Sequence, residues 1–504
     1  MEKSLYSVAQ LRTIEQAVAP LLPPGTLMRR AGEAAARMAL YLLGARRERP
    51  VLVLAGPGNN GGDALEVAAN LAQAGIAVTV WHRPGAAAPS FEGGAALQRA
   101  RASSAAFVDA LPVTGDWGLA IDGLFGIGLA RPLEGEFADA AKALSALPCP
   151  VLALDVPSGL DADTGAVVGP DGVAVEATHT ITFIGDKPGL HTGDGRDHAG
   201  VVRVDSLDIE ARHFMPASAR LGAASLFAAC LRPRRENSHK GSFGDVAVLG
   251  GAEGMAGAAV LAARGALYGG AGRVFVAAVD SGPAFDSVQP EIMFRAAAGF
   301  EFAGRTVVAG PGMGSSAGAL RMLSKVVDGD SPLVLDADGL NQLAASPELQ
   351  PRLGQRAADA ILTPHPLEAA RLLGVTSGVV QGDRLEAARE LAARFDSVVV
   401  LKGSGTVIAR PDGQVTVNTT GNPGLATGGS GDVLAGLCGA LLAQGWPGWE
   451  AALGAVWIHG AAADRLVGLQ AGPIGLTAGE LPAAARWVLN KLVAEQAEKT
   501  RRLR

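Results

Sequence analysis

The sequence is poor in cysteine, with three among 504 residues, at Cys149, Cys230 and Cys438. Their wide spacing matches no metal-ligand pattern and suits a reducing compartment. No uninterrupted apolar stretch approaches the roughly 20 residues that a membrane-spanning helix needs. Residues 1–10 mix charged and polar side chains, which is unlike a secretory signal peptide. We therefore expect a cytoplasmic chain without a membrane partner.

The sequence also lacks a strong excess of either charge, since 43 Lys and Arg stand against 49 Asp and Glu, for a net charge of −6. Because no long basic stripe is present, no nucleic-acid partner is expected. Charged residues make up 18% and apolar residues 48% of the chain, a balance that supplies a large core and argues against disorder. A chain of 504 residues exceeds one hydrophobic core, so two or three domains are expected.

Glycine is abundant, with 68 residues, but it lacks the three-residue period of collagen. The glycines cluster after apolar runs, where a tight turn or the close approach of a ligand requires a residue without Cβ. The ends of the predicted strands are therefore the candidate sites.

The first half of the chain alternates short apolar runs with amphipathic segments. The apolar runs predict buried strands at residues 51–55, 77–81, 119–122, 151–155, 177–184 and 201–204. The other segments predict helices at residues 8–19, 27–43, 64–74, 95–102 and 137–147. Strands that alternate with helices are typical of a doubly wound parallel sheet, so a Rossmann-like α/β domain is expected.

The alternation weakens between residues 208 and 237, and we place a boundary near residue 220, giving domains 1–220 and 221–504. The second half restarts the pattern and predicts another α/β domain. Its strands are expected at residues 245–249, 273–279, 306–309, 332–336, 360–363 and 397–402. Helical segments are expected between the later strands, and named helices at residues 256–268, 432–444 and 449–466. A hairpin is expected at 405–417, with its turn at 411–413.

A glycine-rich loop, Gly-Pro-Gly-Asn-Asn-Gly-Gly-Asp at residues 56–63, joins a predicted strand to a helix. Its backbone can turn tightly, and the N–H groups at the helix start can bind a phosphate. The loop is neither a Walker loop nor the Gly-x-Gly-x-x-Gly dinucleotide motif. Glycines alone would favour an ordinary turn, but Asn59, Asn60 and Asp63 add polar groups and favour a binding site.

Two further strand ends carry polar groups, at residues 122–132 and 155–159. Taken singly, Asp122 could cap a helix and the Pro-Ser-Gly at 157–159 could be only a turn. Ligands of parallel sheets bind just beyond the carboxyl ends of the strands. Three polar strand ends in one sheet therefore favour a site.

The first half resembles the NAD(P)H-hydrate epimerase family. The resemblance includes the Asp-Val-Pro-Ser-Gly-Leu-Asp-Ala-Asp-Thr-Gly run at residues 155–165 and the Phe-Ile-Gly-Asp-Lys-Pro-Gly run at 183–189. It implies that the hydrated nicotinamide nucleotide is held by Asn59, Asn60, Gly61, Gly62, Asp63, Gly126, Ile127, Gly128, Leu129, Ala130, Arg131, Pro132 and Asp155. It also implies a potassium ion on Asn60, Asp122 and Ser158, which fits their oxygen ligands.

Asp155 is the best candidate for proton transfer during inversion at the hydrated ring carbon, because it is a carboxylate at the site. One residue departs from the family pattern. The family loop usually continues with glycine after Asp63, and this chain has Ala64. A Cβ is expected to be tolerated in the first turn of a helix, where φ is negative.

The strongest signal is the run Asn-Pro-Gly-Leu-Ala-Thr-Gly-Gly-Ser-Gly-Asp-Val-Leu-Ala-Gly at residues 422–436. A glycine-rich loop leads straight into an apolar helix, so consecutive N–H groups converge on one anion. Asp432 could merely complement the helix dipole, worth about 0.3–1 kcal/mol. Because that role would not require Gly428, Gly429 and Gly431 around it, we interpret Asp432 as a general base beside bound phosphates.

This loop resembles the anion hole of ribokinase-like kinases, and the second half resembles one branch of that superfamily, the NAD(P)H-hydrate dehydratases. The matching segments lie at residues 240–244, 310–314, 336–341, 363–368 and 402–406. The resemblance implies that a nucleoside diphosphate, usually ADP in bacteria, phosphorylates the ring hydroxyl. Loss of phosphate then restores the ring double bond.

The same resemblance implies contacts to the hydrate from Ala258, Gly312, His365 and Asp432, and to the nucleotide from Lys402, Gly403, Ser404, Gly405, Thr406 and Gly431. His365 lies between two prolines after a predicted strand, and a polar side chain in a rigid turn suits a ligand contact. Ala258 lies in an Ala-rich helix, where packing alone would explain it. A magnesium ion is expected to screen the phosphates.

The resemblance covers both halves in order and implies a bifunctional enzyme that repairs hydrated NADH and NADPH with ADP, expected as a homo-oligomer. Two alternatives stay open. A small-molecule kinase with a non-catalytic Rossmann-like binding domain would release a stable phosphorylated product. A first half that served only as a binding module would let only one epimer of the hydrate be consumed. The sequence leaves open ADP against ATP, and NADH hydrate against NADPH hydrate.

Overall fold

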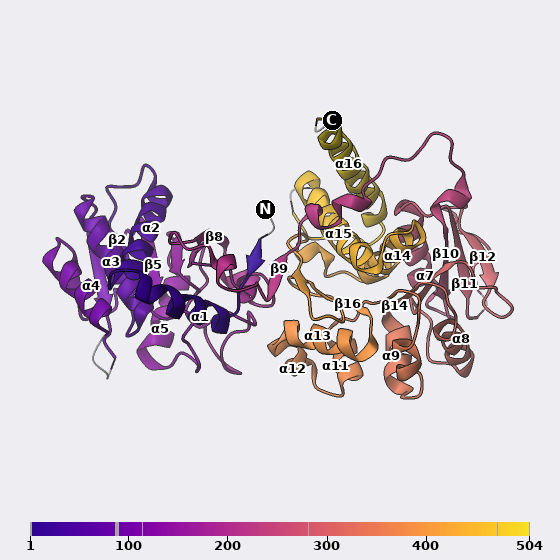
Figure 1. Ribbon diagram of the computed structural model, residues 1–504, viewed down its shortest axis with the longest axis horizontal. Coiled ribbons are helices and arrows are strands. Elements are labelled where there is room, and N and C mark those ends of the chain that lie inside the picture. Colours follow the sequence, from indigo (N-terminus) through magenta and orange to yellow (C-terminus); the bar gives the residue numbers. More distant parts are fainter. Residues whose placement is uncertain (1–2, 86–89, 113, 281, 471, 503–504) are drawn as a thin grey trace. The chain divides into compact units, whose positions relative to one another are not determined.

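The computed structural model describes residues 3–85, 90–112, 114–280, 282–470 and 472–502. Contacts between residues divide the chain into two compact units, Lys3–Arg220 and a second that begins at Leu221. Each unit is an α/β domain with a largely parallel sheet (Figure 1). The fold class predicted from the sequence is therefore confirmed.

The sheet of the first unit has seven strands in the order β4-β3-β2-β5-β6-β7-β8, and all neighbours run parallel. These strands are β2 (Val51–Ala55), β3 (Val78–His82), β4 (Ala106–Val108), β5 (Leu119–Gly123), β6 (Val151–Leu154), β7 (His179–Phe183) and β8 (Val201–Asp205). Every residue of β2, β5 and β6 is buried, because helices cover both faces of the sheet. The loops after β2, β5, β6 and β7 consequently leave the sheet at neighbouring carboxyl ends.

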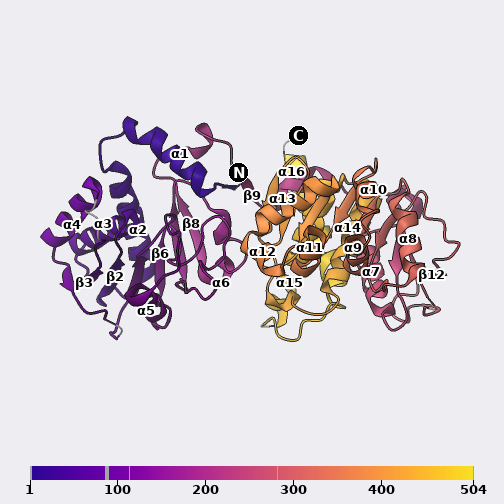
Figure 2. The same ribbon diagram turned by 90° about the horizontal axis from the view of Figure 1, so that it is seen from below.

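The helices of the first unit are α1 (Val8–Val18), α2 (Thr26–Leu43), α3 (Asn59–Gln73), α4 (Phe91–Ala102), α5 (Gly135–Ser145) and α6 (Gly195–His198). Successive side chains of β2 enter different cores. Val51 and Val53 pack with α1, α2 and α3, whereas Leu52 and Leu54 pack with α5. Figure 2 shows α1 and α5 on opposite sides of the strands, as in a doubly wound sheet. A short antiparallel pair, β1 (Ser4–Leu5) with β9 (Ala219–Leu221), lies apart from this sheet.

The strands of the second unit follow the order β18-β17-β16-β15-β14-β13-β10-β11-β12. They are β10 (Asp245–Gly250), β11 (Arg273–Ala278), β12 (Met293–Ala296), β13 (Thr306–Ala309), β14 (Leu333–Leu335), β15 (Ala360–Leu362), β16 (Val398–Leu401), β17 (Val407–Ala409) and β18 (Val415–Val417). The strands from β16 to β12 pair in parallel, and β16-β17-β18 are antiparallel. The predicted hairpin is confirmed, with Gly413 N donating to Arg410 O at 3.0 Å in its turn.

The helices of the second unit are α7 (Ala256–Tyr268), α8 (Ala317–Val327), α9 (Ala337–Ala345), α10 (Gln350–Gly354), α11 (Pro366–Leu373), α12 (Ser377–Gly382), α13 (Arg384–Phe395), α14 (Ser430–Ala443), α15 (Gly448–Gln470) and α16 (Leu481–Arg502). Glycine sets how closely α7 and α14 approach. A Cβ on Gly436 would lie 2.0 Å from Ala262 O, and one on Gly265 would lie 2.4 Å from Val433 O. Any larger residue at these two positions would push the helices apart and move the start of α14.

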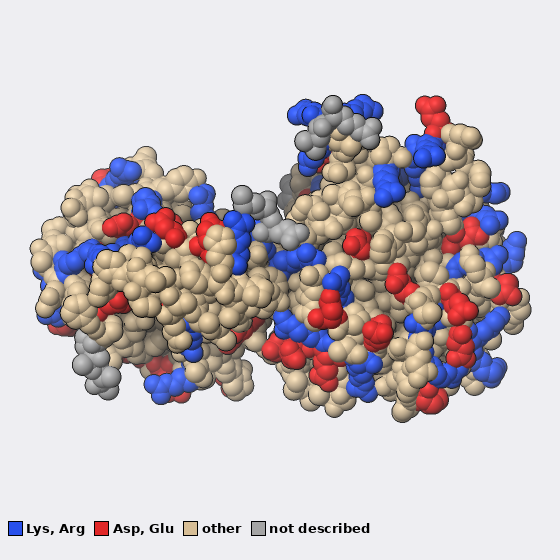
Figure 3. Space-filling view, in the orientation of Figure 1, with Lys and Arg blue, Asp and Glu red and all other residues tan. Residues whose placement is uncertain are grey.

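Short 3₁₀ helices complete the chain at Ala19–Leu21, Pro188–Leu190, Ala211–His213, Ala224–Cys230, Lys240–Phe243 and Pro423–Leu425. Within the described residues, no helix combines the length and the apolar character that crossing a bilayer requires. The three cysteines are unpaired. On the face shown in Figure 3, acidic and basic side chains are interspersed over both units.

Two elements of the second unit escaped the sequence analysis. Strand β12 is a partly exposed edge strand, and its apolar run at residues 292–294 is only three residues long. Helix α16 is apolar only in its first half and ends in charged residues. In addition, α14 begins at Ser430 rather than at Asp432, because Gly429 takes a left-handed conformation (φ +89°) at its N-cap. Asp432 therefore lies inside the first turn of that helix.

Candidate active sites

A cavity of about 860 Å³ opens at the carboxyl ends of the strands in the first unit. Its walls come from α1, from the start of α3, and from the loops after β5, β6 and β7. The predicted site residues that line it are Asn59, Asn60, Asp63, Gly126, Ile127, Gly128, Leu129 and Asp155. The structure thus brings residues from all three predicted strand ends to one cavity.

Other predicted residues of this site do not line the cavity. Gly61 and Gly62 are buried in α3, where a Cβ on Gly61 would lie 1.9 Å from Gly56 O. The glycine there permits the helix to start directly against the end of β2. The segment 130–132 lies beyond the cavity wall, at the surface or half-buried.

Asp122 and Ser158 form a fully buried pair beside the cavity. Ser158 Oγ donates to Asp122 Oδ1 at 2.6 Å, and Ser158 N donates to Asp122 Oδ2 at 2.8 Å. Burial raises the pKa of Asp122 to about 6, against the lowering effect of the hydrogen bonds from Ser158 and Leu124. Ser158 Oγ also lies 3.1 Å from Phe125 O, so several oxygens gather at this point.

The Asn60 side chain is buried, and neither of its amide atoms has a hydrogen-bond partner among the described residues. A buried amide without partners is costly, by roughly 1–3 kcal/mol for each unmade bond. Its Cγ would lie 3.4 Å from a Cβ on Gly126, the residue that also approaches Asp155. The unsatisfied amide therefore lies at the cavity, where a ligand can complete its bonding.

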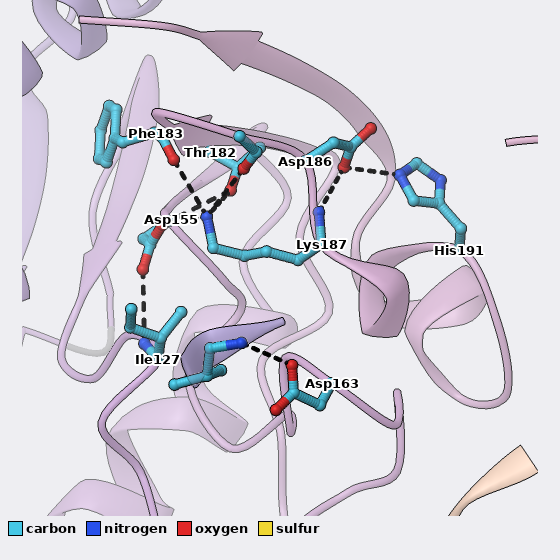
Figure 4. A network of polar contacts seen from close by, with 10 residues as sticks. Ile127, Asp155, Asp163, Thr182, Phe183, Asp186, Lys187 and His191 are labelled. Carbon is cyan, nitrogen blue, oxygen red and sulfur yellow. Dashed lines mark hydrogen bonds and ion pairs between the residues drawn. The ribbon is translucent and has the colours of Figure 1, made fainter. Parts of the chain in front are cut away.

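Asp155 follows β6 in a left-handed conformation, with φ at +66°. Its Oδ1 forms an ion pair with Lys187 Nζ at 2.8 Å, and its Oδ2 accepts a hydrogen bond from Ile127 N at 3.4 Å (Figure 4). A Cβ on Gly126 would lie 3.0 Å from Oδ2, so glycine leaves that oxygen uncovered. Asp155 thus combines one oxygen held by a cation with another at the cavity wall.

Three more carboxyl groups line the same cavity, those of Glu15, Asp63 and Glu92. Burial and the negative charge of Asp155 raise the pKa of Glu15, with Lys187 and Arg12 opposing. Burial and the charges of Asp155 and Glu15 raise the pKa of Asp63 well above its ordinary value. The cavity is therefore lined by four acidic groups, and burial and mutual repulsion favour the protonated form of Glu15 and Asp63.

Sequence analysis missed Glu15 and Lys187. Glu15 is one polar residue of an amphipathic helix, and nothing in the sequence places it near residue 155. Lys187 lies within the 183–189 run that carries the resemblance, directly after a strand. That position could have identified it.

In the second unit, four charged side chains lie close together near the start of α14, namely those of Asp336, Glu368, Lys402 and Asp432. Lys402 Nζ lies 2.6 Å from Asp336 Oδ1 and 3.9 Å from Glu368 Oε2. A Cβ on Gly431 would lie 3.2 Å from the same Nζ, and one on Gly429 would lie 3.8 Å from Asp432 Oδ2. The predicted glycine loop, Lys402 and Asp432 are thus brought together.

The pKa of Asp432 is raised to about 7, first by burial and then by the charges of Asp336, Asp338 and Glu368, with Lys402 opposing. Burial likewise raises the pKa of Glu368 to about 6. For Lys402, burial lowers the pKa, but the neighbouring carboxylates outweigh that effect and raise it. A carboxyl group with a pKa near neutrality is suited to accept a proton in catalysis.

His365 is the N-cap of α11, and its Nδ1 accepts from Leu367 N at 3.1 Å and from Glu368 N at 3.3 Å. Its Nε2 lies 3.3 Å from Glu368 Oε1, and 46% of the side chain is exposed. Burial and the charge of Lys402 lower the pKa of His365. The ring is therefore fixed on one edge by the helix and open on the other.

Two further residues predicted to contact the hydrate are adjacent. Gly312 has φ at +57°, and a Cβ there would lie 3.2 Å from Ala258 Cβ and 2.3 Å from Met255 O. Gly314 N donates to Asp338 Oδ2 at 2.8 Å, which joins this loop to the carboxylates around Asp432. The backbone approach at Gly312 excludes any side chain at that position.

The predicted nucleotide segment follows β16. Arg384, which the sequence analysis missed, donates hydrogen bonds to the backbone at the start of this segment. Gly403 and Ser404 are exposed, and Thr406 Oγ1 donates to Gly403 O at 3.0 Å. The Arg384 side chain is fully buried, and its Nη2 donates to Leu401 O and Lys402 O, each at 3.2 Å. The buried guanidinium thus fixes the backbone that carries Lys402.

Comparison with known proteins gives matches on both units. The model of the family described as YjeF-related protein N-terminus matches residues 24–189, and that described as NAD(P)H-hydrate dehydratase matches residues 246–481. The chain is 39% identical over 502 residues to the bifunctional NAD(P)H-hydrate repair enzyme Nnr of Coxiella burnetii, an alignment that covers 96% of this chain and 99% of that protein.

Two further similarities concern the second unit. The ADP-dependent (S)-NAD(P)H-hydrate dehydratase of Neisseria meningitidis is 45% identical over 280 residues, covering 54% of this chain and 94% of that protein. Among solved structures, the ADP/ATP-dependent NAD(P)H-hydrate dehydratase of Bacillus subtilis, co-crystallized with ATP/Mg²⁺, is 32% identical. It covers 54% of this chain and 97% of that chain, with a TM-score of 0.47.

Proposed function

The chain belongs to the family of bifunctional NAD(P)H-hydrate repair enzymes, and we propose that its first unit epimerises hydrated NADH and NADPH while its second dehydrates the S epimer. The observation that carries this function is the alignment with a bifunctional repair enzyme across 96% of the chain, through both units. Each unit also holds a carboxyl group at the carboxyl edge of its own sheet, Asp155 in the first and Asp432 in the second. One chain therefore returns both epimers to NADH or NADPH.

In the first unit, Asp155 is the proton-transfer residue of the epimerase. It lines a cavity large enough for a nucleotide, and its Oδ2 lies at the cavity wall beside Ile127 N. The N–H groups at the start of α3 provide an anion site for a phosphate of the substrate. The residues that hold the substrate are those predicted ones that line the cavity.

The pair Asp122 and Ser158, with Asn60, forms the potassium site of this unit. Three observations fit a large monovalent cation: the ligand atoms are oxygens, the Asn60 amide is buried without a partner, and Asp122 lacks a cationic partner among the described residues. A bound potassium ion would offset the charge of Asp122 and orient the Asn60 amide. Both effects would order the cavity floor.

In the second unit, Asp432 accepts the proton of the ring hydroxyl as that oxygen attacks the terminal phosphorus of ADP. A C–O–P ester forms, AMP leaves, and the phosphate then departs with a ring proton to restore the double bond. The nucleotide contacts Lys402, Gly403, Ser404, Gly405, Thr406 and Gly431. Magnesium enters with the nucleotide, because Mg²⁺ is commonly held by phosphates, water and one or two carboxylates.

A kinase that acts on a different small molecule is the competing function for the second unit. The two are separated by incubating the full chain with hydrated NADH, ADP and Mg²⁺ while following NADH absorbance and free phosphate. Repair releases one phosphate for each NADH formed. A stable phosphorylated product without NADH would establish the kinase instead. ATP in place of ADP in a parallel reaction decides the nucleotide.

A further inference from the structure

Two neighbouring strands of the first unit, β6 and β7, end in the same uncommon turn. After β6, Val156 N donates to Leu154 O at 2.8 Å around Asp155, whose φ is +66°. After β7, Gly185 N donates to Phe183 O at 2.7 Å around Ile184, whose φ is +64°. Such γ-turns with positive φ are strained, most of all for a β-branched residue. Strain of this kind persists where the surrounding structure holds a functional geometry.

These two turns bring Asp155 and Lys187 together. The Lys187 side chain is 1% exposed, and its Nζ donates to Thr182 Oγ1 at 2.5 Å, to Gly185 O at 3.2 Å and to Phe183 O at 3.3 Å (Figure 4). Its only charged contact among the described residues is Asp155 Oδ1, at 2.8 Å. An isolated buried ammonium would be strongly disfavoured, so this cation is held by its oxygens and by one carboxylate.

The other charged groups that interact electrostatically with Asp155 are negative, namely Glu15 from α1 and Asp63 from α3. Glu92 from α4 also lines the cavity, as does Arg12, whose positive charge acts on Glu15. Lys187 supplies the opposing charge, so without this ammonium Asp155 would face only other acidic groups among the described residues.

The backbone of Lys187 is itself fixed on both sides. Lys187 N donates to Asp186 Oδ1 at 2.9 Å, and His191 Nε2 lies 2.8 Å from the same oxygen. Tyr6 N donates to Asp186 O at 2.8 Å, which ties the loop to the N-terminal segment. These hydrogen bonds hold the Lys187 backbone in place, and with it the ammonium that contacts Asp155 (Figure 4).

We propose that Lys187 is a positioning residue of the epimerase: it holds Oδ1 of Asp155, pairs the charge of that carboxylate, and leaves Oδ2 directed to the cavity. This role rests on the proposed function of Asp155 in proton transfer. Lys187 also lines the cavity, but its side chain is 1% exposed and its ammonium is engaged by four protein oxygens, so it acts through Asp155 rather than on the substrate.

The test uses the full-length chain, with the dehydratase of the second unit as an internal control for intact protein. Lys187→Met removes the charge at nearly constant volume, and Lys187→Gln removes it but keeps a hydrogen-bond donor. Both should lower the epimerase kcat by about 100-fold, in the range of a lost acid–base contribution, with little change in KM. Both should also move the acidic limb of the kcat/KM profile to higher pH. Thr182→Val removes an acceptor of Lys187 and a 3.5 Å hydrogen bond to Asp155 Oδ1 but no charge, so it should move the acidic limb much less than Lys187→Met does.

The Asp155→Asn background separates positioning from general support of the fold. If Lys187 acts through Asp155, Lys187→Met lowers the residual activity of Asp155→Asn no further. An equal loss in both backgrounds, or a wild-type pH profile in Lys187→Gln, would overturn the positioning role. Full activity of Asp155→Asn alone would instead refute the proposed function of Asp155, a distinct result.

Discussion

Lys402 Nζ lies 2.6 Å from Asp336 Oδ1, an ion pair that links the end of β16 to the end of β14 in the second unit. The Asp336 side chain is 1% exposed, so water cannot solvate its charge. Glu368 and Asp432 also act on Lys402, which makes this ammonium the counter-charge for three carboxyl groups. The order of the second site depends on that single cation.

Lys402→Met should destabilise the second unit and abolish dehydration. Removing one partner of a buried ion pair leaves the other charge uncompensated, at a cost of roughly 3–5 kcal/mol. Urea unfolding of the full chain measures the loss, with the epimerase activity as a control for the first unit. The double variant Lys402→Met with Asp336→Asn should regain part of the stability. A double variant no more stable than Lys402→Met would contradict the electrostatic explanation.

Asp432→Asn should lower the dehydratase kcat by about 100-fold or more, since it removes the proposed base. In the wild type, kcat/KM should rise with pH around the Asp432 pKa of about 7, because the base must be ionised. Adding Asp338→Asn should shift that limb to lower pH, since one of the charges that raises the pKa is gone. A profile that stays flat from about one pH unit below that pKa to about one unit above it would contradict the assignment.

Asp432→Asn should also stabilise the protein at alkaline pH. The raised pKa means that the folded state binds the Asp432 proton more tightly than the unfolded state. The stabilisation from that proton is complete below about pH 4 and is lost as pH rises through about 7. Asp432→Asn should therefore have a higher Tm than the wild type at alkaline pH and the same Tm at acidic pH. Equal Tm values at alkaline pH would show that the Asp432 carboxylate is not electrostatically disfavoured.

Ser158→Ala should weaken potassium activation of the epimerase. It removes the Oγ that donates to Asp122 Oδ1 at 2.6 Å and deletes one proposed potassium ligand. Titration of epimerase activity with KCl at constant ionic strength should show a higher half-saturating concentration than in the wild type. Ser145→Ala, on a helix outside the cavity, serves as the matched control. Wild-type activity that is independent of potassium would refute the proposed site.

Ala64→Gly should leave epimerase kcat unchanged and lower stability by about 1 kcal/mol, the helix-propensity difference between the residues. Ala64 lies inside α3 and is fully buried. Its Cβ fills the space above Gly123, where a second Cβ would lie 2.4 Å away. The departure from the family loop thus contributes to packing at the helix–strand contact. A large gain in kcat for Ala64→Gly would show instead that Ala64 limits the epimerase.

The strand ends of the first site were predictable because each follows an apolar run that a parallel sheet buries. Asn59, Asp63 and Asp155 therefore line one cavity as the sequence predicted. Residues 130–132 belong to the unbroken segment that the family resemblance implies, but they do not line the cavity and are exposed or half-buried. In contrast, the sequence does not reveal which charge meets Asp155. Lys187 stands in the 183–189 run that carries the resemblance, but its contact with Asp155 depends on the strained turn at Ile184, which has no local sequence signal.

In the second site, the glycine loop and Asp432 were readable because the loop runs directly into an apolar helix. Arg384 was not, because a charged residue at the start of an amphipathic helix is usually exposed. Here the Arg384 guanidinium donates hydrogen bonds to the carbonyl groups of Leu401 and Lys402. This contact arises because α13 packs on the sheet, which the sequence alone does not reveal. Sequence therefore predicted the groups that face the ligands better than those that support them.

The most direct test of two activities in one chain is the time course of NADH return from a mixed-epimer hydrate with excess ADP and Mg²⁺. The wild type should convert all of the hydrate at an enzymatic rate, because the R epimer is continuously inverted. Asp155→Asn should consume the S fraction at the wild-type rate and then continue only at the slow rate of spontaneous epimerisation. A wild-type reaction that also stops at the S fraction would contradict the account.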